Sequence, residues 1–257
     1  MNRTAPDYSI VVPVLYEQET IEDLIDHLVT IENFTRCELI VVDGDPEGGT
    51  IRKISSDRVI KLVSPPGRSR QMNAGAAAAS GDILIFLHAD TCLPEGALAE
   101  IGSVLAAGAS AAGAFRLSFD SDRFIYRFMS YFVTLRSRWN HLPYGDQAIF
   151  IRRDFFEKIG GYKDIPIMED VDIVRRIRRA GGDLKILDSA VRTSCRRMEA
   201  EGITHRVLQN WMMTILYNLG VSPHKLARFY SEDYRLAGER DGPVPQSGPS
   251  VRPGDKP

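Results

Sequence analysis

The sequence has 257 residues, of which 44% are hydrophobic and 26% are charged, and its formal net charge is −2 at pH 7. That length accommodates one large domain or two small ones, and the composition is ordinary for a globular protein with a substantial core. The nearly balanced charge gives no indication of a nucleic-acid-binding protein, which would carry a basic excess.

Three cysteines, Cys37, Cys92 and Cys195, are widely separated. They lack the Cys/Cys or Cys/His spacing of a zinc site, and their odd number suits a reducing compartment. The N-terminus shows no signal-peptide pattern, and no stretch reaches the roughly 18 uninterrupted apolar residues of a membrane-spanning helix. We therefore expect a cytoplasmic protein without a spanning segment.

In the N-terminal half, short apolar runs alternate with helical patterns. Strands are predicted over 9–14, 38–42, 59–63 and 82–87, and helices over 21–28, 51–54, 71–79 and 94–107. Such alternation implies right-handed crossovers and a mainly parallel sheet, so we predict an α/β fold with a central sheet flanked by helices. No G-x-G-x-x-G follows the first strand, which argues against a NAD-dependent enzyme.

The pattern becomes more aromatic after Gly113. Strands are predicted over 114–119, 148–151 and 184–187, and helices over 124–139, 168–180, 207–219 and from Pro223 to about Leu236. The pair Gly181-Gly182 is a strong signal for the end of the third-last helix.

Two of these helices carry apolar stripes at helical spacing. The stripes consist of Phe124, Phe128, Tyr131, Phe132 and Leu135, and of Val207, Leu208, Trp211, Met212, Ile215, Leu216 and Leu219. Such periodicity usually identifies the face that packs in the core, so we expect both helices to dock on their own domain. The alternatives are an acceptor surface on the first helix, and closure of the acceptor side or contact with a membrane surface by the second.

Two acidic residues are notable for their positions. Asp90 follows the apolar run 82–87, and a carboxylate at the carboxyl end of a buried parallel strand lies where open α/β sheets bind ligands. There it would either hold a divalent cation that bridges substrate phosphates or cap the helix near Pro94. Asp170 opens a later helix, where it is either an ordinary cap or a general base that faces the cleft.

Four ordered stretches carry a resemblance to a known family. They are Ser9–Glu17 (SIVVPVLYE), Glu38–Asp45 (ELIVVDGD), Gly81–Asp90 (GDILIFLHAD) and Met168–Asp172 (MEDVD), the last followed by Arg175, Arg176, Ala180 and Gly181. Over about residues 8–185 the chain resembles the family 2 glycosyltransferases with a GT-A fold. Closest is the subgroup called radical-SAM/selenodomain-associated transferase 2, through Gly67–Gly75 (GRSRQMNAG), Leu87–Thr91 (LHADT) and Tyr144–Gln147 (YGDQ).

This resemblance implies a set of residues that bind the sugar donor. Pro13 and Glu17 would lie beside the nucleotide, and Asp43 would read its base. Arg70 and Asn73 would border the diphosphate.

The resemblance also implies the metal site and the catalytic base. Asp90 would be the last acid of the family's D-x-D motif and would face the cation, and Asp170 would be the base. The chain departs from the family pattern at two positions. His88 replaces the first acid of D-x-D beside the donor, which weakens the expected cation site, and Gly48 stands where the family often has Asp.

The implied function is inverting transfer of a sugar from a nucleotide-diphospho-sugar to an acceptor hydroxyl, assisted by Mg²⁺ or Mn²⁺ at Asp90. Late arginines such as Arg196 and Arg197 would add positive charge near the leaving diphosphate. Two alternatives stay open. One is a sugar-phosphate nucleotidyltransferase, which the acidic segment 14–19 disfavours, and the other is a non-catalytic nucleotide-sugar-binding protein, which His88 favours.

Residues 1–237 are expected to form one GT-A domain, with a nucleotide-sugar-binding half (about 8–107), an acceptor half (108–200) and C-terminal helices (201–237). High Pro, Gly, Ser and charge content predicts a disordered tail over 238–257. The expected partners are the nucleotide-sugar donor and a small-molecule or lipid acceptor. No nucleic acid is expected, and membrane contact would be peripheral at most.

Overall fold

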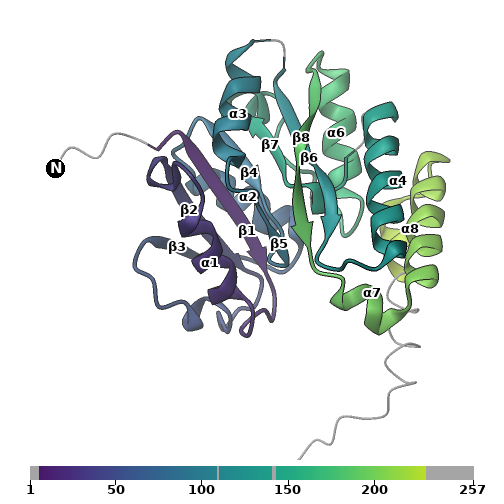
Figure 1. Cartoon of the computed structure of the whole chain (residues 1–257), viewed down its shortest axis with the longest axis horizontal. Coiled ribbons are helices and arrows are strands. Elements are labelled where there is room, and N and C mark those ends of the chain that lie inside the picture. The colour runs from purple at the N-terminus through teal and green to yellow at the C-terminus, as the bar shows by residue number, and fades with distance from the viewer. Residues whose placement is uncertain (1–5, 109, 141–142, 230–257) are drawn as a thin grey trace, which may run out of the picture.

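The structure is a computed structural model that describes residues 6–108, 110–140 and 143–229. The predicted tail over 238–257 and the end of the last predicted helix lie outside these residues. Helices cover both faces of one eight-stranded sheet (Figure 1). This arrangement confirms the predicted α/β class.

The strand order across the sheet is β3-β2-β1-β4-β7-β6-β8-β5. The strands are β1 Tyr8–Val14, β2 Cys37–Asp43, β3 Val59–Val63, β4 Ile83–Phe86, β5 Thr91–Cys92, β6 Ala112–Phe119, β7 Ile149–Arg152 and β8 Leu184–Thr193. All neighbouring pairs among β1 to β4 are parallel, as is the pair β6–β8, whereas β7 and β5 are antiparallel to their neighbours. Six of the eight strands therefore run in one direction, as predicted for a mainly parallel sheet.

The helices alternate with the strands. They are α1 Ile21–Thr30, α2 Arg68–Ala78, α3 Ala97–Ala106, α4 Phe124–Asn140, α5 Arg153–Lys158, α6 Glu169–Arg179, α7 Arg196–Glu201 and α8 Ile203–Asn218, with short 3-10 turns η1 Phe34–Arg36, η2 Ile51–Lys53 and η3 Gly145–Gln147. In α1 the predicted stripe Ile21, Leu24, Ile25 and Leu28 is fully buried. Burial of this face against the sheet is what stabilises the helix, since a ten-residue helix is marginal in isolation.

Two hydrophobic cores lie on opposite faces of the sheet. Ile10 and Val12 of β1 face the core built with α1 and α3, whereas Val11 faces the core built with α2, α5 and α6. Successive strand residues point to opposite faces, so a strand buried on both sides reads as a continuous apolar run. This double burial explains why the central strands were recognisable in the sequence.

The order of the strands creates a topological switch point at one edge of the sheet, where the ligand crevice of open α/β sheets is expected. From β1 the chain builds outward through β2 and β3, then returns to place β4 on the other side of β1. Helical connections therefore diverge at the carboxyl ends of β1 and β4. Ligands of open α/β sheets bind at such a switch point, so the segments that follow these two strands are the first place to look for a site.

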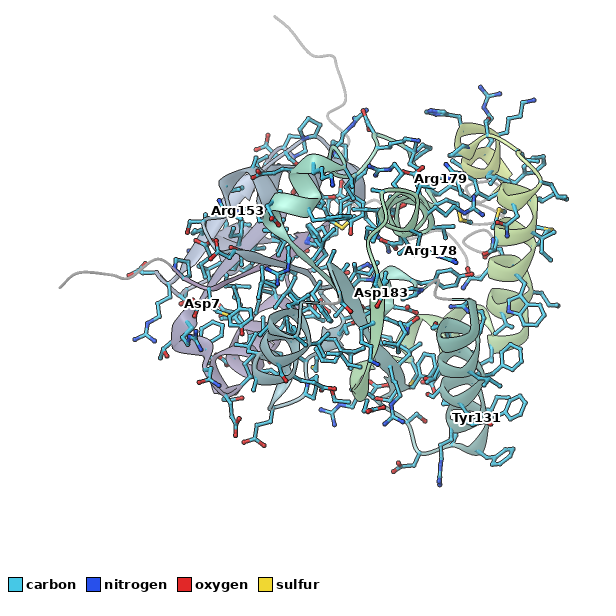
Figure 2. The ribbon with its side chains drawn as sticks, turned by 90° about the horizontal axis from the view of Figure 1, so that it is seen from above. Asp7, Tyr131, Arg153, Arg178, Arg179 and Asp183 are labelled. Atoms are coloured by element: carbon cyan, nitrogen blue, oxygen red, sulfur yellow. The ribbon has the colours of Figure 1, made fainter. Side chains whose placement is uncertain are left out.

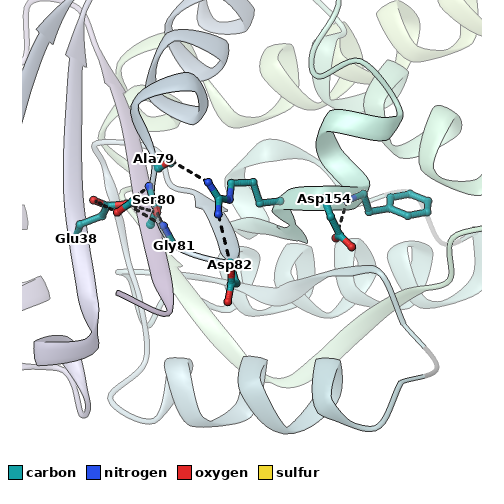
Figure 3. Close-up of polar contacts among 9 residues, drawn as sticks. Glu38, Ala79, Ser80, Gly81, Asp82 and Asp154 are labelled. Atoms are coloured by element: carbon teal, nitrogen blue, oxygen red, sulfur yellow. Dashed lines mark hydrogen bonds and ion pairs between the residues drawn. The ribbon is translucent and has the colours of Figure 1, made fainter. Parts of the chain in front are cut away.

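The start of β4 is fixed by a polar clamp (Figure 3). The Glu38 carboxylate on β2 accepts hydrogen bonds from the backbone N–H groups of Ser80 and Gly81 at 2.5 and 3.1 Å. On the other side, an Arg153 guanidinium nitrogen lies 3.6 Å from the Asp82 carboxylate. Because the clamp fixes where β4 begins, it also fixes where the strand ends and where its following residues project.

The strand β5 was not predicted. Thr91 and Cys92 pair antiparallel with the end of β8, in the region predicted as a loop before a helix. A two-residue strand has no periodicity to recognise. This short strand helps to position Asp90. The Asp90 carbonyl accepts a hydrogen bond from the Ser194 N–H at 3.0 Å and is thereby held against β8.

The predicted orientation of two apolar stripes is wrong. On α4, the side chains of the stripe from Phe124 to Leu135 are 39–81% exposed, whereas the aromatic side chain of Tyr126 is fully buried. On α8, Trp211 is 47% exposed and Met213 is the buried one. Figure 2 shows Tyr131 at the outer side of the molecule. Periodicity identifies an apolar face, but both helices have a second, narrower apolar face, and that one packs inward.

Candidate active site

Glu17, predicted to lie beside the nucleotide, closes the loop after β1. The Glu17 N–H donates to the Thr50 hydroxyl at 3.1 Å, and its buried carboxylate accepts from Thr20 at 3.0 Å. Pro13 lies near the end of β1, opposite Val42 of β2. An Arg196 guanidinium nitrogen lies 4.0 Å from the Glu17 carboxylate, so the chain after β8 reaches this loop.

Asp43, at the end of β2, organises the loop that follows it. Its fully buried carboxylate accepts hydrogen bonds from the N–H groups of Asp45, Thr50 and Ile51 at 2.9, 2.8 and 3.2 Å. Within the same loop Gly48 has a φ of +62°, a conformation that an aspartate would adopt only with strain. The backbone conformation of this loop therefore favours glycine at position 48.

Gln71 was missed by sequence reasoning although it lies within a quoted motif. Its buried side-chain amide donates to the carbonyls of Val14 and Val42, at 2.7 and 2.8 Å. These carbonyls lie at the carboxyl ends of β1 and β2. Gln71 thus joins α2 to both strand ends and fixes the floor of the crevice, and no pattern in the sequence marks a polar residue that points into a sheet.

Arg70 and Asn73, the predicted diphosphate neighbours, both connect α2 to the loop before α6. Arg70 makes two hydrogen bonds to the Asp164 carboxylate, at 2.8 and 3.0 Å. Asn73 exchanges two hydrogen bonds with the backbone of Tyr162, at 2.7 and 2.9 Å. Asn73 therefore has a positioning role visible in the structure, while both side chains of the Arg70–Asp164 pair are exposed.

His88 and Asp90 follow β4 at the switch point. The Asp90 carboxylate accepts a hydrogen bond from the Thr91 hydroxyl at 3.3 Å. A Cβ added to Gly145 would lie 2.7 Å from His88 Nε2, which shows how closely the segment 144–147 approaches the end of this strand.

The segment Tyr144–Gln147 is anchored by its last residue. The fully buried Gln147 amide accepts from Ser137 at 2.8 Å and donates to the Phe115 carbonyl at 2.8 Å. This anchoring holds Gly145 against α6, where its N–H donates to Asp170 Oδ2 at 3.0 Å. A side chain at position 145 would collide with Asp170, since its Cβ would lie 2.3 Å from Oδ2.

Asp170 is not a helix cap. The cap position of α6 is Met168, and no side chain caps it. The Asp170 carboxylate instead reaches across to Gly145, and its Oδ1 is buried without a hydrogen-bond partner among the described residues. Burial raises the pKa of Asp170, opposed by the positive charge of Arg68. Burial likewise raises the pKa of the adjacent Glu169, with the charge of Asp170 adding to the rise.

Asp146 is a further carboxylate of the site, to which sequence reasoning gave no role. Burial raises its pKa to about 6, with Asp170 and Asp90 adding to the rise and Arg136 opposing it. The Arg136 guanidinium stacks 3.8 Å from the centre of the Tyr144 ring. The only hint in the sequence was the motif YGDQ itself, because the partners of Asp146 lie far along the chain.

Backbone strain gathers around the same place. Within the described ranges, four non-glycine residues have positive φ, and three of them, Tyr16, Ala148 and Met168, flank the segments just described. Such conformations cost about 1–3 kcal/mol each and persist where the surrounding structure enforces them, often at functional sites.

The structure thus brings together the two acids on which the predicted chemistry depends. His88, two residues before Asp90, and Asp170 both approach Gly145, and the charges of Asp90 and Asp170 both raise the pKa of Asp146. The chain from 6 to 229, outside its gaps, contains no cluster of three or more His, Cys, Asp or Glu residues able to hold a metal unaided. Arg197 belongs to the predicted set, but its side chain lies outside the described part.

Comparison with known sequences identifies the family. Residues 9–163 match the family model described as glycosyl transferase family 2, and because this match covers more than half of the chain, the chain belongs to that family. It is 35% identical over 96 residues to glucosyl-3-phosphoglycerate synthase of Mycobacterium tuberculosis, over 34% of this chain and 30% of the relative. It is 25% identical over 210 residues to the probable glycosyltransferase YdaM of Bacillus subtilis, over 72% and 50%. The chain spans half the length or less of these relatives.

Solved structures agree on the fold. The mannosyltransferase PcManGT of Pyrobaculum calidifontis, in complex with GDP-Man and Mn²⁺, superposes with a TM-score of 0.56 at 18% identity, over 74% of this chain and 57% of that one. Residues 1–349 of S. aureus TarS superpose with a TM-score of 0.58 at 15% identity, over 76% and 62%. The domain therefore has a GT-A fold. Among the helices described here, none combines the length and hydropathy needed to cross a bilayer.

Proposed function

We propose that the protein is an inverting glycosyltransferase that moves a sugar from a nucleotide-diphospho-sugar to an acceptor hydroxyl. The observation that carries this proposal is that the segment His88–Asp90, at the switch point of the sheet, and Asp170 on α6 both approach Gly145. In this proposal Asp90 serves the donor side and Asp170 serves the acceptor side. A radical-SAM/selenodomain-associated subgroup and a cytoplasmic location remain our predictions from sequence.

A divalent cation fits the donor side only together with the donor itself. Asp90 supplies one carboxylate, and Mg²⁺ or Mn²⁺ is commonly bound by one or two carboxylates plus substrate phosphates. This fits the absence of a complete protein-only ligand cluster in the described residues. When bound, the cation would stabilise the negative charge that develops on the leaving nucleoside diphosphate. The neighbour solved with GDP-Man and Mn²⁺ supports this choice.

Asp170 is the proposed general base. Its Oδ2 is oriented by the Gly145 N–H, and its buried Oδ1 is left to accept the proton of the acceptor hydroxyl as that oxygen attacks the anomeric carbon. The raised pKa makes Asp170 a stronger base than an exposed aspartate. Asp43, Glu17 and Pro13 would form the nucleotide side of the crevice, with Arg70 and Asn73 near the diphosphate.

The donor can be identified by thermal shift. We expect one class among UDP-, GDP-, ADP- and dTDP-sugars to raise the melting temperature in the presence of Mn²⁺, because a ligand that binds the folded state stabilises it by RT ln(1 + [L]/Kd). The shift should disappear in Asp90→Ala. If the donor raises the melting temperature of Asp90→Ala as much as that of the wild type, Asp90 is not part of the cation site. In a separate assay, release of pyrophosphate from a nucleoside triphosphate and a sugar phosphate would indicate a nucleotidyltransferase instead.

The base can be tested with Asp170→Asn once the donor is known. Donor binding should be retained, while kcat should fall by about 10²–10⁴, the usual contribution of general-base catalysis. Measurement of kcat against pH should show the wild-type rate falling as the pH is lowered through the pKa of Asp170, because the protonated form cannot accept a proton. Normal turnover in Asp170→Asn would assign the base elsewhere. Donor binding without transfer in the wild type would indicate a binding protein.

A further inference from the structure

The outer faces of α4 and α8 form one continuous apolar surface, called here the aromatic face. The two helices lie side by side (Figure 1), and the rings of Phe132 and Trp211 stack across them with centroids 5.6 Å apart. Of the 17 large hydrophobic side chains exposed in the described residues, 11 belong to this surface. They are Phe124, Ile125, Phe128, Tyr131, Phe132, Leu135, Leu208, Trp211, Met212, Ile215 and Leu219.

The charge of this surface has one sign. Neither α4 nor α8 contains an aspartate or glutamate, and among the described side chains of these two helices the exposed charged one is Arg127. Arg127 is exposed and lies one helical turn from both Phe124 and Tyr131, so it borders the aromatic face. An apolar face rich in aromatic residues and flanked by arginine is the composition of helices that lie in the plane of a membrane interface.

A second copy of the chain is a poor occupant of the aromatic face. A two-fold dimer places the same patch of both subunits in contact, so Arg127 of each copy would be enclosed in the shared interface. No acidic residue of α4 or α8 would be present to neutralise its charge. The C-terminal residues 238–257 are also a poor occupant, since Val244 and Val251 are their only aliphatic or aromatic side chains other than proline.

We propose that the aromatic face docks on the surface of an anionic lipid bilayer. The aromatic and aliphatic side chains enter the boundary between headgroups and acyl chains, where Trp, Tyr and Phe are favoured, and Arg127 reaches the lipid phosphates. This attachment is peripheral.

The inward sides of the same helices contact the candidate active site. Arg136 of α4 stacks on Tyr144, and the Tyr144 hydroxyl is hydrogen-bonded to Thr214 of α8 at 2.9 Å. Docking therefore sets the segment Tyr144–Gln147 near the bilayer. The binding proposal does not depend on the proposed catalysis, because it is tested without donor, cation or turnover.

The test is flotation of the full chain with vesicles of phosphatidylcholine alone and of phosphatidylcholine mixed with phosphatidylserine. We expect binding to the mixed vesicles, weakened by salt and reduced about tenfold or more in Phe128→Glu and in Trp211→Glu. Arg127→Gln should weaken binding to the mixed vesicles and leave binding to neutral vesicles unchanged. The matched control is Val29→Glu, at a 42% exposed position on α1 at the other end of the molecule, which should bind like the wild type (Figure 1).

Circular dichroism and thermal melting establish that each variant is folded. Failure of the folded wild-type chain to float with anionic vesicles would overturn the proposal, as would wild-type binding by both glutamate variants. Light scattering measures whether the chain is a monomer or a dimer in solution. A dimer that Phe128→Glu dissociates would make the aromatic face an interface between copies of this chain.

Discussion

Gly145 is the residue on which the geometry of the candidate site depends most directly. Its N–H orients Asp170, and the absence of a side chain leaves room for Asp170 and His88. Its backbone φ is not in the left-handed region, so glycine is needed here for close approach rather than for conformation. Of the two residues that follow Gly145, Asp146 places its carboxylate in the candidate site and Gln147 places its amide in the core.

Gly145→Ala should therefore leave the fold intact and impair transfer. The added Cβ would lie 2.3 Å from Asp170 Oδ2, so the carboxylate must move. We expect kcat to fall about 10²-fold, since a displacement of about 1 Å at a reacting group has such an effect. The control is Gly96→Ala, where nothing lies within 4 Å of the added atom. Unchanged kcat in Gly145→Ala would mean that the position of Asp170 is not critical.

At the scale of elements, the first turn of α6 holds the proposed base in place. The Asp172 carboxylate is paired with Arg176 at 2.6 Å and with Lys163 at 3.1 Å, and Arg176 also donates to the carbonyls of Ile159 and Gly161. These contacts tie α6 to the loop that precedes it. The negative charges of the first turn are also favoured by the helix dipole.

Asp172→Asn should destabilise the protein by about 2–4 kcal/mol, because it leaves the largely buried Arg176 without its carboxylate partner. Denaturation by urea would measure the free energy of unfolding. Asp7→Asn is the matched control, since it breaks an ion pair with Arg36 in which both side chains are exposed, and such pairs contribute about 0–1 kcal/mol. Equal effects of the two substitutions would show that burial of the α6 network does not matter.

At the scale of the whole molecule, the fold buries several carboxyl groups where the end of the sheet meets α6 and η3. Asp90, Asp146 and Asp170 come from segments far apart in the chain, and the charges of Asp90 and Asp170 add to the effect of burial on the pKa of Asp146. A group whose pKa is raised in the folded state stabilises that state while it is protonated. Its contribution is lost as the pH rises through the raised pKa.

Asp146→Asn should therefore stabilise the protein at high pH relative to the wild type. The pKa of Asp146 rises from 3.8 to about 6, which corresponds to at most about 3 kcal/mol above that pH, and the difference should vanish at about pH 4 or below. Urea denaturation at several pH values measures it, with Asp26→Asn on the exposed side of α1 as control. Destabilisation at high pH that vanishes at low pH would show that the attraction between the ionised Asp146 and Arg136 outweighs burial.

The sequence by itself determined the fold class, the central strands and the family. Strands such as β1, buried on both faces, leave continuous apolar runs, and α1 leaves a single clean stripe, so local patterns were sufficient. Asp90 and Asp170 are candidates from sequence because they follow or open such elements and lie in ordered motifs.

The tertiary structure alone decided three further features. The tertiary structure places the aromatic face of α4 and α8 outward. The sequence could not predict this, because the periodicity of an apolar stripe does not indicate which of two apolar sides of a helix packs against the core. The tertiary structure formed β5, which is too short to have a period. It also brought Asp146 to Asp90 and Asp170, because pairings across dozens of residues depend on the order of strands in the sheet and are not encoded in any local pattern.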